Sequence, residues 1–226
     1  MKLENKKLIL FDLDGTLVDS IPDLVVSVNY MLNEIGREPF DDETVRTWVG
    51  NGVQVLVQRA LSGDVNIDEN IDKAFFENSL KIFMEFYEKN VCIKTTIYDN
   101  VKDTLEALHG KGYTLAVVTN KPYAFVEPIL KKLKINRVFK MIVGGDSLEK
   151  KKPDPLQLVH VCEKLGFTIK QSVMVGDSKN DILAAKSAGM QSIGVTYGYN
   201  YGEDISLYKP DIVIDNFAEL ENHLKD

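Results

Sequence analysis

The stretch LILFDLDGT at residues 8–16 decides the fold. The apolar run from Leu8 to Leu10 follows two lysines and is too short for a helix, so we expect a buried strand. Asp12 and Asp14 stand where that strand ends. Because two desolvated carboxylates repel each other, they stay ionised only when a cation or several hydrogen-bond donors compensate their charge. The stretch therefore predicts a bound cation, and Mg²⁺ fits best because it prefers oxygen ligands.

Size and composition are those of a soluble globular protein. The chain has 226 residues, of which 44% are hydrophobic and 27% charged, which suits one large domain or a core domain with a smaller insert. The net charge of -7, without clusters of lysine and arginine, argues against a nucleic-acid partner. No apolar run approaches the roughly 20 residues that cross a bilayer, so we expect no membrane partner either. Nor does any apolar segment before Asp12 resemble a secretory leader.

The two cysteines, Cys92 and Cys162, lack the spacing of metal ligands and lie among apolar residues. We expect both to be buried, reduced thiols. A reduced thiol pair in a chain without a leader predicts a cytoplasmic protein.

From residue 19 to residue 92 every periodic segment predicts a helix. Ser20-Ile21-Pro22-Asp23 has the Ser-x-x-Asp pattern of a capping box, and apolar residues then recur at helical spacing until Gly36. A turn is expected at Trp48–Gly52. The further predicted helices cover residues 45–49, 53–61 and 71–87.

Short β-branched runs alternate with helical segments from residue 96 onward, which predicts a parallel sheet covered by helices on both faces. The first strand has the composition of these later strands, so the helical block is an insertion over the sheet edge. We therefore predict an α/β fold: a doubly wound, Rossmann-like core of residues 1–18 and 93–226, with an all-helical cap of residues 19–92. The predicted later strands cover residues 114–119, 141–143, 172–175, 192–195 and 212–214.

Polar side chains follow several of these predicted strands. Thr119-Asn120-Lys121 ends one strand and Gly176–Asp181 ends another, while a third leads through two glycines to Lys152. Ligands of a doubly wound sheet bind outside the carboxyl ends of its strands. We expect these groups to meet Asp12 and Asp14 in one site.

Four of these stretches resemble, in order, the motifs of the haloacid-dehalogenase-like hydrolase superfamily. They are Asp-x-Asp-x-Thr at residues 12–16, the strand-ending Thr119, Lys152 before a proline, and Gly-Asp-x-x-x-Asp at residues 176–181. The helical insertion resembles the C1-type cap of that superfamily. The resemblance covers nearly the whole chain and implies hydrolysis of phosphate esters.

The resemblance also implies a role for each matching residue. Asp12 is expected to be the nucleophile that forms an aspartyl-phosphate, and Asp14 the general acid and base. Mg²⁺ is expected on the Asp12 carboxylate, the backbone carbonyl of Asp14 and the carboxylate of Asp177.

The remaining matching residues are expected to bind the phosphoryl group or to support the site. Thr119, Asn120, Lys152 and the backbone from Gly15 are the expected phosphate ligands. Asp181 and Ser178 are expected to position the groups that touch metal and substrate.

Each residue alone has a plainer interpretation. A turn explains the paired aspartates, and a helix cap explains Thr119 and Asn120. The dipole of the following helix explains Asp177 and Asp181, and a solvated lysine run explains Lys152. Their shared location at strand ends favours the functional interpretation.

The expected substrate depends on Asp14 and on two stretches that resemble one subfamily of the superfamily. Asp14 argues against dehalogenation, because a halide leaving group needs no proton. Residues 195–203 and Trp48–Gly52 resemble bacterial phosphoglycolate phosphatases, which implies 2-phosphoglycolate as substrate. A phosphosugar phosphatase, a β-phosphoglucomutase-like phosphomutase and a non-catalytic binding scaffold of the same fold stay open.

A small acid phosphate brings a carboxylate that needs a cation or N–H donors. Arg46 and the turn containing Gly50, Asn51 and Gly52 are the candidate specificity residues. The expected partner is thus a small anionic phosphate ester, bound by a monomer or weak homodimer whose cap opens and closes.

Overall fold

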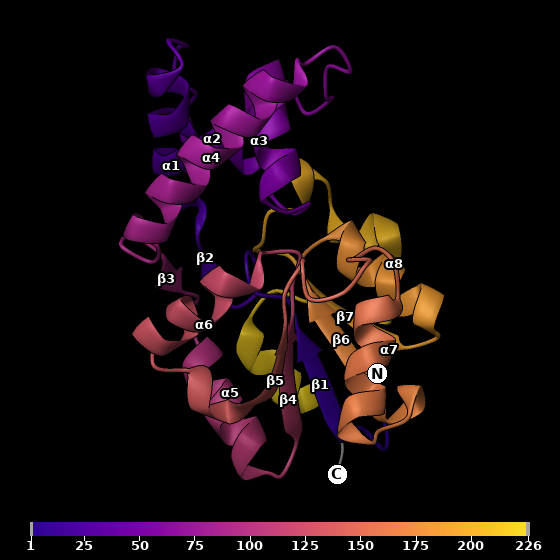
Figure 1. Cartoon of the computed structure of the whole chain (residues 1–226). Helices are drawn as coiled ribbons and strands as arrows, with labels where there is room; N and C mark the ends of the chain where they lie inside the picture. Colours follow the sequence, from indigo (N-terminus) through magenta and orange to yellow (C-terminus); the bar gives the residue numbers. More distant parts are fainter. Residues whose placement is uncertain (1, 225–226) are drawn as a thin grey trace.

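The computed structural model describes residues 2–224, and a six-stranded parallel sheet forms its centre (Figure 1). The strands are β1 (Leu8–Phe11), β4 (Thr114–Val118), β5 (Phe139–Val143), β6 (Ser172–Gly176), β7 (Gln191–Val195) and β8 (Ile212–Ile214). Their order is β5-β4-β1-β6-β7-β8, so β1 lies between two parallel neighbours. In register, Leu10 pairs with Ala116 on one side and Met174 on the other. The predicted doubly wound α/β sheet is confirmed.

Helices cover both faces of the sheet. The side chains of β1 point alternately to the two faces and pack against both helical layers. Ile9 and Phe11 pack into the cluster beneath α5 (Val101–Gly110), α6 (Tyr123–Lys132) and α9 (Leu220–His223). Leu8 and Leu10 pack on the other face beneath α7 (Leu156–Leu165) and α8 (Lys179–Ala188). All four side chains of β1 are buried, each stabilising the fold by about 1.5–3 kcal/mol. The strand is therefore fixed where it ends at Asp12.

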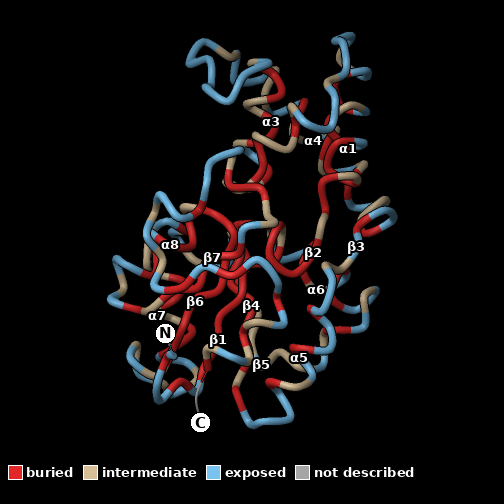
Figure 2. The backbone as a smooth tube through the Cα atoms, turned by 180° about the vertical axis from the view of Figure 1, so that it is seen from behind, coloured by how far each residue is buried: buried red, intermediate tan, exposed pale blue. Residues whose placement is uncertain are grey.

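A second group of helices, here called the four-helix group, lies over the carboxyl ends of the strands (Figure 1). It has a separate hydrophobic cluster, in which Val28, Trp48, Val57 and Phe83 are buried. Figure 2 shows buried residues, in red, both in the sheet domain and in the four-helix group. The helices of this group are α1 (Ile21–Glu34), α2 (Asp42–Arg46), α3 (Val53–Ser62) and α4 (Lys73–Asn90).

Two very short strands join the four-helix group to the sheet. β2 (Val18–Asp19) and β3 (Thr96–Ile97) run antiparallel, with Val18 opposite Ile97. A strand of two residues has no periodicity to detect, so the sequence pattern did not predict this pair. Short 3₁₀ turns complete the structure at Asn136–Val138, Ile169–Gln171, Asn200–Gly202, Ile205–Tyr208 and Phe217–Glu219.

The capping box expected at the start of α1 is wrong. The Ser20 hydroxyl donates instead to Asp14 Oδ1 at 2.5 Å. The Asp23 carboxylate accepts hydrogen bonds from the backbone N–H groups of Lys94 and Thr95, both at 2.8 Å. Both side chains thus have tertiary partners far along the chain or in the site, which a local pattern cannot reveal.

Both cysteines, Cys92 and Cys162, are free and buried, as predicted. Burial raises the pKa of each thiol above its ordinary value. Within residues 2–224, no helix combines the length and the apolar character needed to cross a bilayer.

Candidate active site

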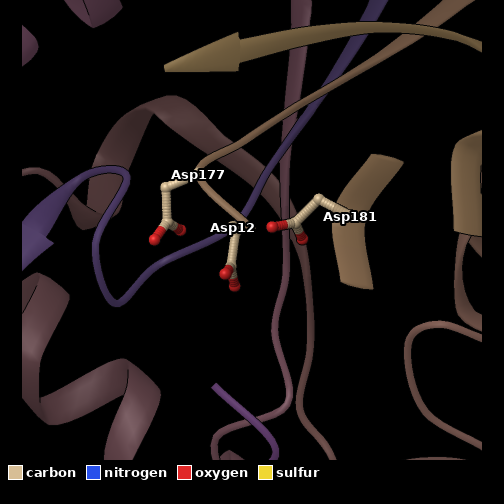
Figure 3. A group of neighbouring side chains, drawn as sticks. All are labelled: Asp12, Asp177 and Asp181. Carbon is tan, nitrogen blue, oxygen red and sulfur yellow. The ribbon is translucent and has the colours of Figure 1, made fainter. Parts of the chain in front are cut away.

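Three aspartates converge where β1 and β6 end (Figure 3). Asp12 follows β1, Asp177 follows β6, and Asp181 lies in the first turn of α8. One carboxylate oxygen from each lies within 4.8 Å of the other two. Asp177 and Asp181 are buried, and Asp12 is nearly so. Because hard cations bind clustered carboxylate oxygens, this group can hold a metal ion.

The electrostatics of the cluster support a cation. Burial raises the pKa of Asp12 to about 7, although nearby Lys152 lowers it. Burial also raises the pKa of Asp177 to about 8, and the charges of Asp12 and Asp181 add to that increase. Three carboxylates and one ammonium, which contacts Asp12 and Asp181, leave an excess of two negative charges when all are ionised. A divalent cation would balance that excess, so the residues present fit a bound metal.

Lys152 is buried beside this cluster and contacts two of its three aspartates. Its Nζ lies 2.6 Å from Asp181 Oδ1, 2.9 Å from Asp12 Oδ1 and 2.6 Å from the carbonyl oxygen of Val118. Burial lowers the pKa of Lys152, but the two carboxylates raise it above its ordinary value overall. The alternative of a solvated lysine is therefore wrong for Lys152.

The two carboxylate oxygens of Asp181 have different partners. Its Oδ2 accepts hydrogen bonds from the Ser178 N–H at 3.0 Å and the Ser178 hydroxyl at 2.8 Å, which caps α8. Its Oδ1 accepts from Lys152. The cap of α8 therefore fixes the carboxylate that holds the buried ammonium.

Asp14 lies beside Lys121, a residue that was expected near the site but was given no role of its own. Lys121 Nζ is 3.0 Å from Asp14 Oδ1 and 3.2 Å from Oδ2, and the Ser20 hydroxyl donates to the same carboxylate. The Lys121 ammonium also lies 5.0 Å from the centre of the Tyr87 ring of α4. Burial lowers the pKa of Lys121, but Asp14 and Tyr87 more than reverse this. The signal was its position directly after Thr119 and Asn120.

Thr119 and Asn120 are buried at the end of β4. Thr119 Oγ1 accepts a hydrogen bond from the Lys121 N–H at 3.2 Å. Asn120 Nδ2 donates to the carbonyl oxygens of Gly50 at 3.0 Å and Lys152 at 2.9 Å, so both of its amide protons have protein acceptors. Asn120 thereby connects the four-helix group to the loop that contains Lys152.

Gly15 allows the chain to turn tightly beside Asp177. Its φ is +88°, and a Cβ at this position would lie 2.3 Å from Asp177 Oδ2. The Gly15 N–H donates to the carbonyl oxygen of Val18 at 2.9 Å. The structure thus brings Gly15 to the site but engages its N–H in the turn rather than leaving it for a phosphate.

The 48–52 turn of the four-helix group docks directly on the strand ends. The carbonyl oxygen of Gly50 accepts hydrogen bonds from Asn120 and, at 3.1 Å, from Asn180 Nδ2. Lys151 Nζ donates to the carbonyl oxygen of Asn51 at 2.7 Å. A Cβ at Gly52 would lie 2.8 Å from the backbone oxygen of Asn120. Glycine is required there for the close approach of the two backbones.

Tyrosines of residues 195–203 make further contacts with the four-helix group and with β2. The Tyr199 hydroxyl accepts from the Ser20 N–H and donates to Asp19 Oδ1, both at 2.8 Å. The Tyr201 hydroxyl donates to Asn51 Oδ1 at 2.8 Å. Tyr199 is buried between the parts that these contacts join.

A cavity of about 30 Å³ lies between the 48–52 turn and the strand ends. It has room for about two water molecules. Gly50 and Gly52 line it, whereas Arg46 and Asn51 are not among its lining residues. Arg46 lies instead 5.1 Å above the Tyr199 ring and 3.6 Å from Asp19. The lining residues are Asp12, Asp14, Thr119, Asn120 and Lys121 of the sheet domain, and Leu24, Val49, Gly50, Gly52, Val53 and Leu56 of the four-helix group.

Known proteins are similar to this chain in both sequence and fold. The family described as haloacid dehalogenase-like hydrolase matches residues 9–195. A phosphoglycolate phosphatase of Colwellia psychrerythraea is 48% identical over 225 residues, covering the whole of both chains. Phosphoglycolate phosphatase 1 of Pseudomonas aeruginosa is 46% identical over 214 residues, covering 95% of this chain and 78% of its own.

A solved structure agrees with these relatives. The crystal structure of a predicted phosphoglycolate phosphatase from Haemophilus somnus superimposes with a TM-score of 0.90 at 43% identity. It covers 97% of this chain and 98% of its own. The sequence match extends over most of the chain, and the motifs of the family meet in one site. The protein therefore belongs to the haloacid dehalogenase-like hydrolase family.

Proposed function

We propose that the protein is a Mg²⁺-dependent phosphatase that hydrolyses a small phosphate monoester, 2-phosphoglycolate, to glycolate and phosphate. One observation carries the proposal: Asp12 and Asp14 face a small cavity beside a buried cluster that combines carboxylates with the Lys152 ammonium. A carboxylate nucleophile, a second acid two residues away and balanced positive charge are what phosphoryl transfer requires.

In the first half-reaction an Asp12 carboxylate oxygen attacks phosphorus. The new bond joins Asp12 to the phosphoryl group, the ester P–O bond breaks, and Asp14 gives its proton to the departing glycolate oxygen. In the second half-reaction Asp14 takes a proton from water, whose oxygen attacks phosphorus. The bond between phosphorus and Asp12 then breaks, which releases phosphate, restores the Asp12 carboxylate and leaves Asp14 protonated, as it was at the start.

The other groups of the site hold charge and position. Mg²⁺, bound by the carboxylates of Asp12 and Asp177 and the backbone carbonyl of Asp14, would neutralise charge on the transferring phosphoryl group. Lys152 and Thr119 would bind phosphoryl oxygens, while Asp181 and Ser178 hold Lys152 and α8 in place. Because both Asn120 amide protons already have acceptors, its role in the closed form is to dock the 48–52 turn.

The four-helix group acts as a cap in this proposal. Residues 19–92 would move as the cap and residues 1–18 and 93–226 as the core, with the antiparallel β2 and β3 as the connection between them. Since the closed cavity has room for about two waters, the cap must open to admit substrate and release product. We further propose a cytoplasmic protein that is a monomer or weak homodimer.

The substrate assignment is supported by relatives and by size. The relatives at 46–48% identity carry the name phosphoglycolate phosphatase. A two-carbon leaving group suits the small cavity better than a sugar does. A phosphosugar phosphatase, a β-phosphoglucomutase-like mutase and a non-catalytic scaffold remain the competing functions.

A panel of small phosphate esters, assayed with and without Mg²⁺, tests the proposal. We expect kcat/KM to be highest for 2-phosphoglycolate and phosphate release to require Mg²⁺. A sugar phosphate preferred by more than about tenfold would replace the substrate assignment. No phosphate release from any ester with Mg²⁺ present would favour the binding scaffold.

A further inference from the structure

We propose that Lys121 binds the carboxylate of the substrate and so selects acidic phosphate esters over neutral ones. This proposal rests on the proposed function, since it names the residue that recognises the part of 2-phosphoglycolate that does not react. The role was expected of Arg46, and the structure provides a better placed cation.

Among the described residues that line the cavity, Lys121 is the only cation. Lys152 is adjacent, but its ammonium already contacts Asp12, Asp181 and the carbonyl oxygen of Val118. Two carboxylates and a carbonyl oxygen thus already surround the Lys152 ammonium, which lies beside Asp12, where the phosphoryl group reacts in the proposed function. The Arg46 guanidinium faces Asp19 and the Tyr199 ring. Lys121 is therefore the cation that a carboxylate in the cavity would meet.

The chemistry of the substrate requires its carboxylate to lie close to Asp14. In 2-phosphoglycolate one methylene carbon separates the ester oxygen from the carboxyl carbon. The acid that protonates the ester oxygen must therefore be next to the group that binds the carboxylate. Lys121 Nζ lies 3.0 Å from Asp14 Oδ1, which satisfies this requirement.

The present contacts of Lys121 show that its ammonium can receive a carboxylate here. Asp14 presents both oxygens to it, at 3.0 and 3.2 Å. When Asp14 turns to the ester oxygen, at least one of these contacts is released and a donor of Lys121 becomes free for the substrate. One buried ammonium can thus bridge the catalytic acid and the substrate carboxylate.

The four-helix group contributes the other side of this subsite. The Tyr87 ring of α4 lies against the Lys121 ammonium, at 5.0 Å from ring centre to Nζ. The side chains of Leu24, Val53 and Leu56 line the cavity without adding charge. Closing these groups over Lys121 removes water from the ammonium, which strengthens its attraction to a carboxylate.

The test compares 2-phosphoglycolate with ethyl phosphate, whose leaving groups both have two carbons but of which only glycolate carries a carboxylate. We expect Lys121→Met to lower the ratio of their kcat/KM values roughly 10- to 150-fold, the effect of one hydrogen bond to a charged group. The loss should appear mainly as a higher KM for 2-phosphoglycolate. Lys121→Arg should recover part of the ratio, because a guanidinium also binds carboxylates.

Arg46→Met is the matched control, and it should leave the substrate ratio unchanged. If Lys121→Met reduces both substrates equally, Lys121 only positions Asp14 and the proposal is overturned. If thermal unfolding shows that Lys121→Met does not fold, Lys121→Gln replaces it. The ratio of the two kcat/KM values then tests the proposal in the same way. A wild-type protein that hydrolyses ethyl phosphate but not 2-phosphoglycolate would instead refute the proposed function.

Discussion

Replacing Lys152 with methionine perturbs the charge balance on which the site depends. Methionine keeps most of the length and volume of the side chain but removes the ammonium. Asp12 and Asp181 then lose a cation at 2.9 and 2.6 Å, in surroundings where the lysine side chain is only 1% exposed. We expect a folded but strongly destabilised protein with little or no phosphatase activity.

The magnitude follows from burial and distance. At an effective dielectric constant of about 20, each ion pair is attractive by about 6 kcal/mol before desolvation is counted. Breaking a buried pair by removing one partner typically costs about 3–5 kcal/mol net, because the remaining charge stays buried. For a chain of this size that corresponds to a fall in Tm of about 6–20 °C.

The Tm of the variant and of the wild type, measured in EDTA, gives the size of this effect. Repeating the measurement with Mg²⁺ separates the part caused by the lost positive charge from the part caused by altered packing. Added Mg²⁺ should recover part of the lost Tm, since the cation compensates Asp12. Lys150→Met is the control from the same lysine run: its side chain is 61% exposed and pairs with the partly exposed loop residue Asp154, so a change within about 0.5 kcal/mol is expected. A Lys152→Met protein as stable as the control would refute the reasoning.

Two further predictions concern the metal-free site and the docked turn. Because the pKa of Asp12 is raised to about 7 and that of Asp177 to about 8, the folded protein holds extra protons, and its Tm in EDTA should fall from about pH 5 to pH 8. A Tm that is flat or rises contradicts this. Tyr201→Phe removes the hydrogen bond to Asn51 and should weaken cap docking by about 1 kcal/mol, read as a higher KM without loss of Tm beyond about 3 °C. A KM for Tyr201→Phe equal to that of the wild type would contradict this prediction.

Much of the fold was predictable because its signals are local. The four residues of β1 are apolar on both faces, and a strand buried on both faces needs that composition. The glycines after α7 and α8 adopt the left-handed conformation that commonly ends a helix. Asp12, Asp177 and Lys152 meet because parallel strands place their carboxyl ends at one edge.

The contacts that join the two parts of the molecule were not predictable in the same way. Ser20 and Asp23 have the pattern of a local cap, yet their partners are Asp14 and the backbone of residues 94–95. The position of Lys121 after Thr119 and Asn120 indicates a strand end but not which side chains it contacts. One of them is Tyr87 of α4, which lies 34 positions earlier in the chain. Such pairings arise from how the four-helix group closes on the sheet, and no periodicity records them.

The most direct test of the central claim is to trap the phosphoryl group on Asp12. The protein is mixed with 2-phosphoglycolate and Mg²⁺, quenched in acid within one turnover, digested and analysed by mass spectrometry. We predict one added phosphoryl group on the peptide that contains Asp12, and none in Asp12→Asn. Turnover of 2-phosphoglycolate with no such adduct, or an Asp12→Asn variant as active as the wild type, would contradict the account.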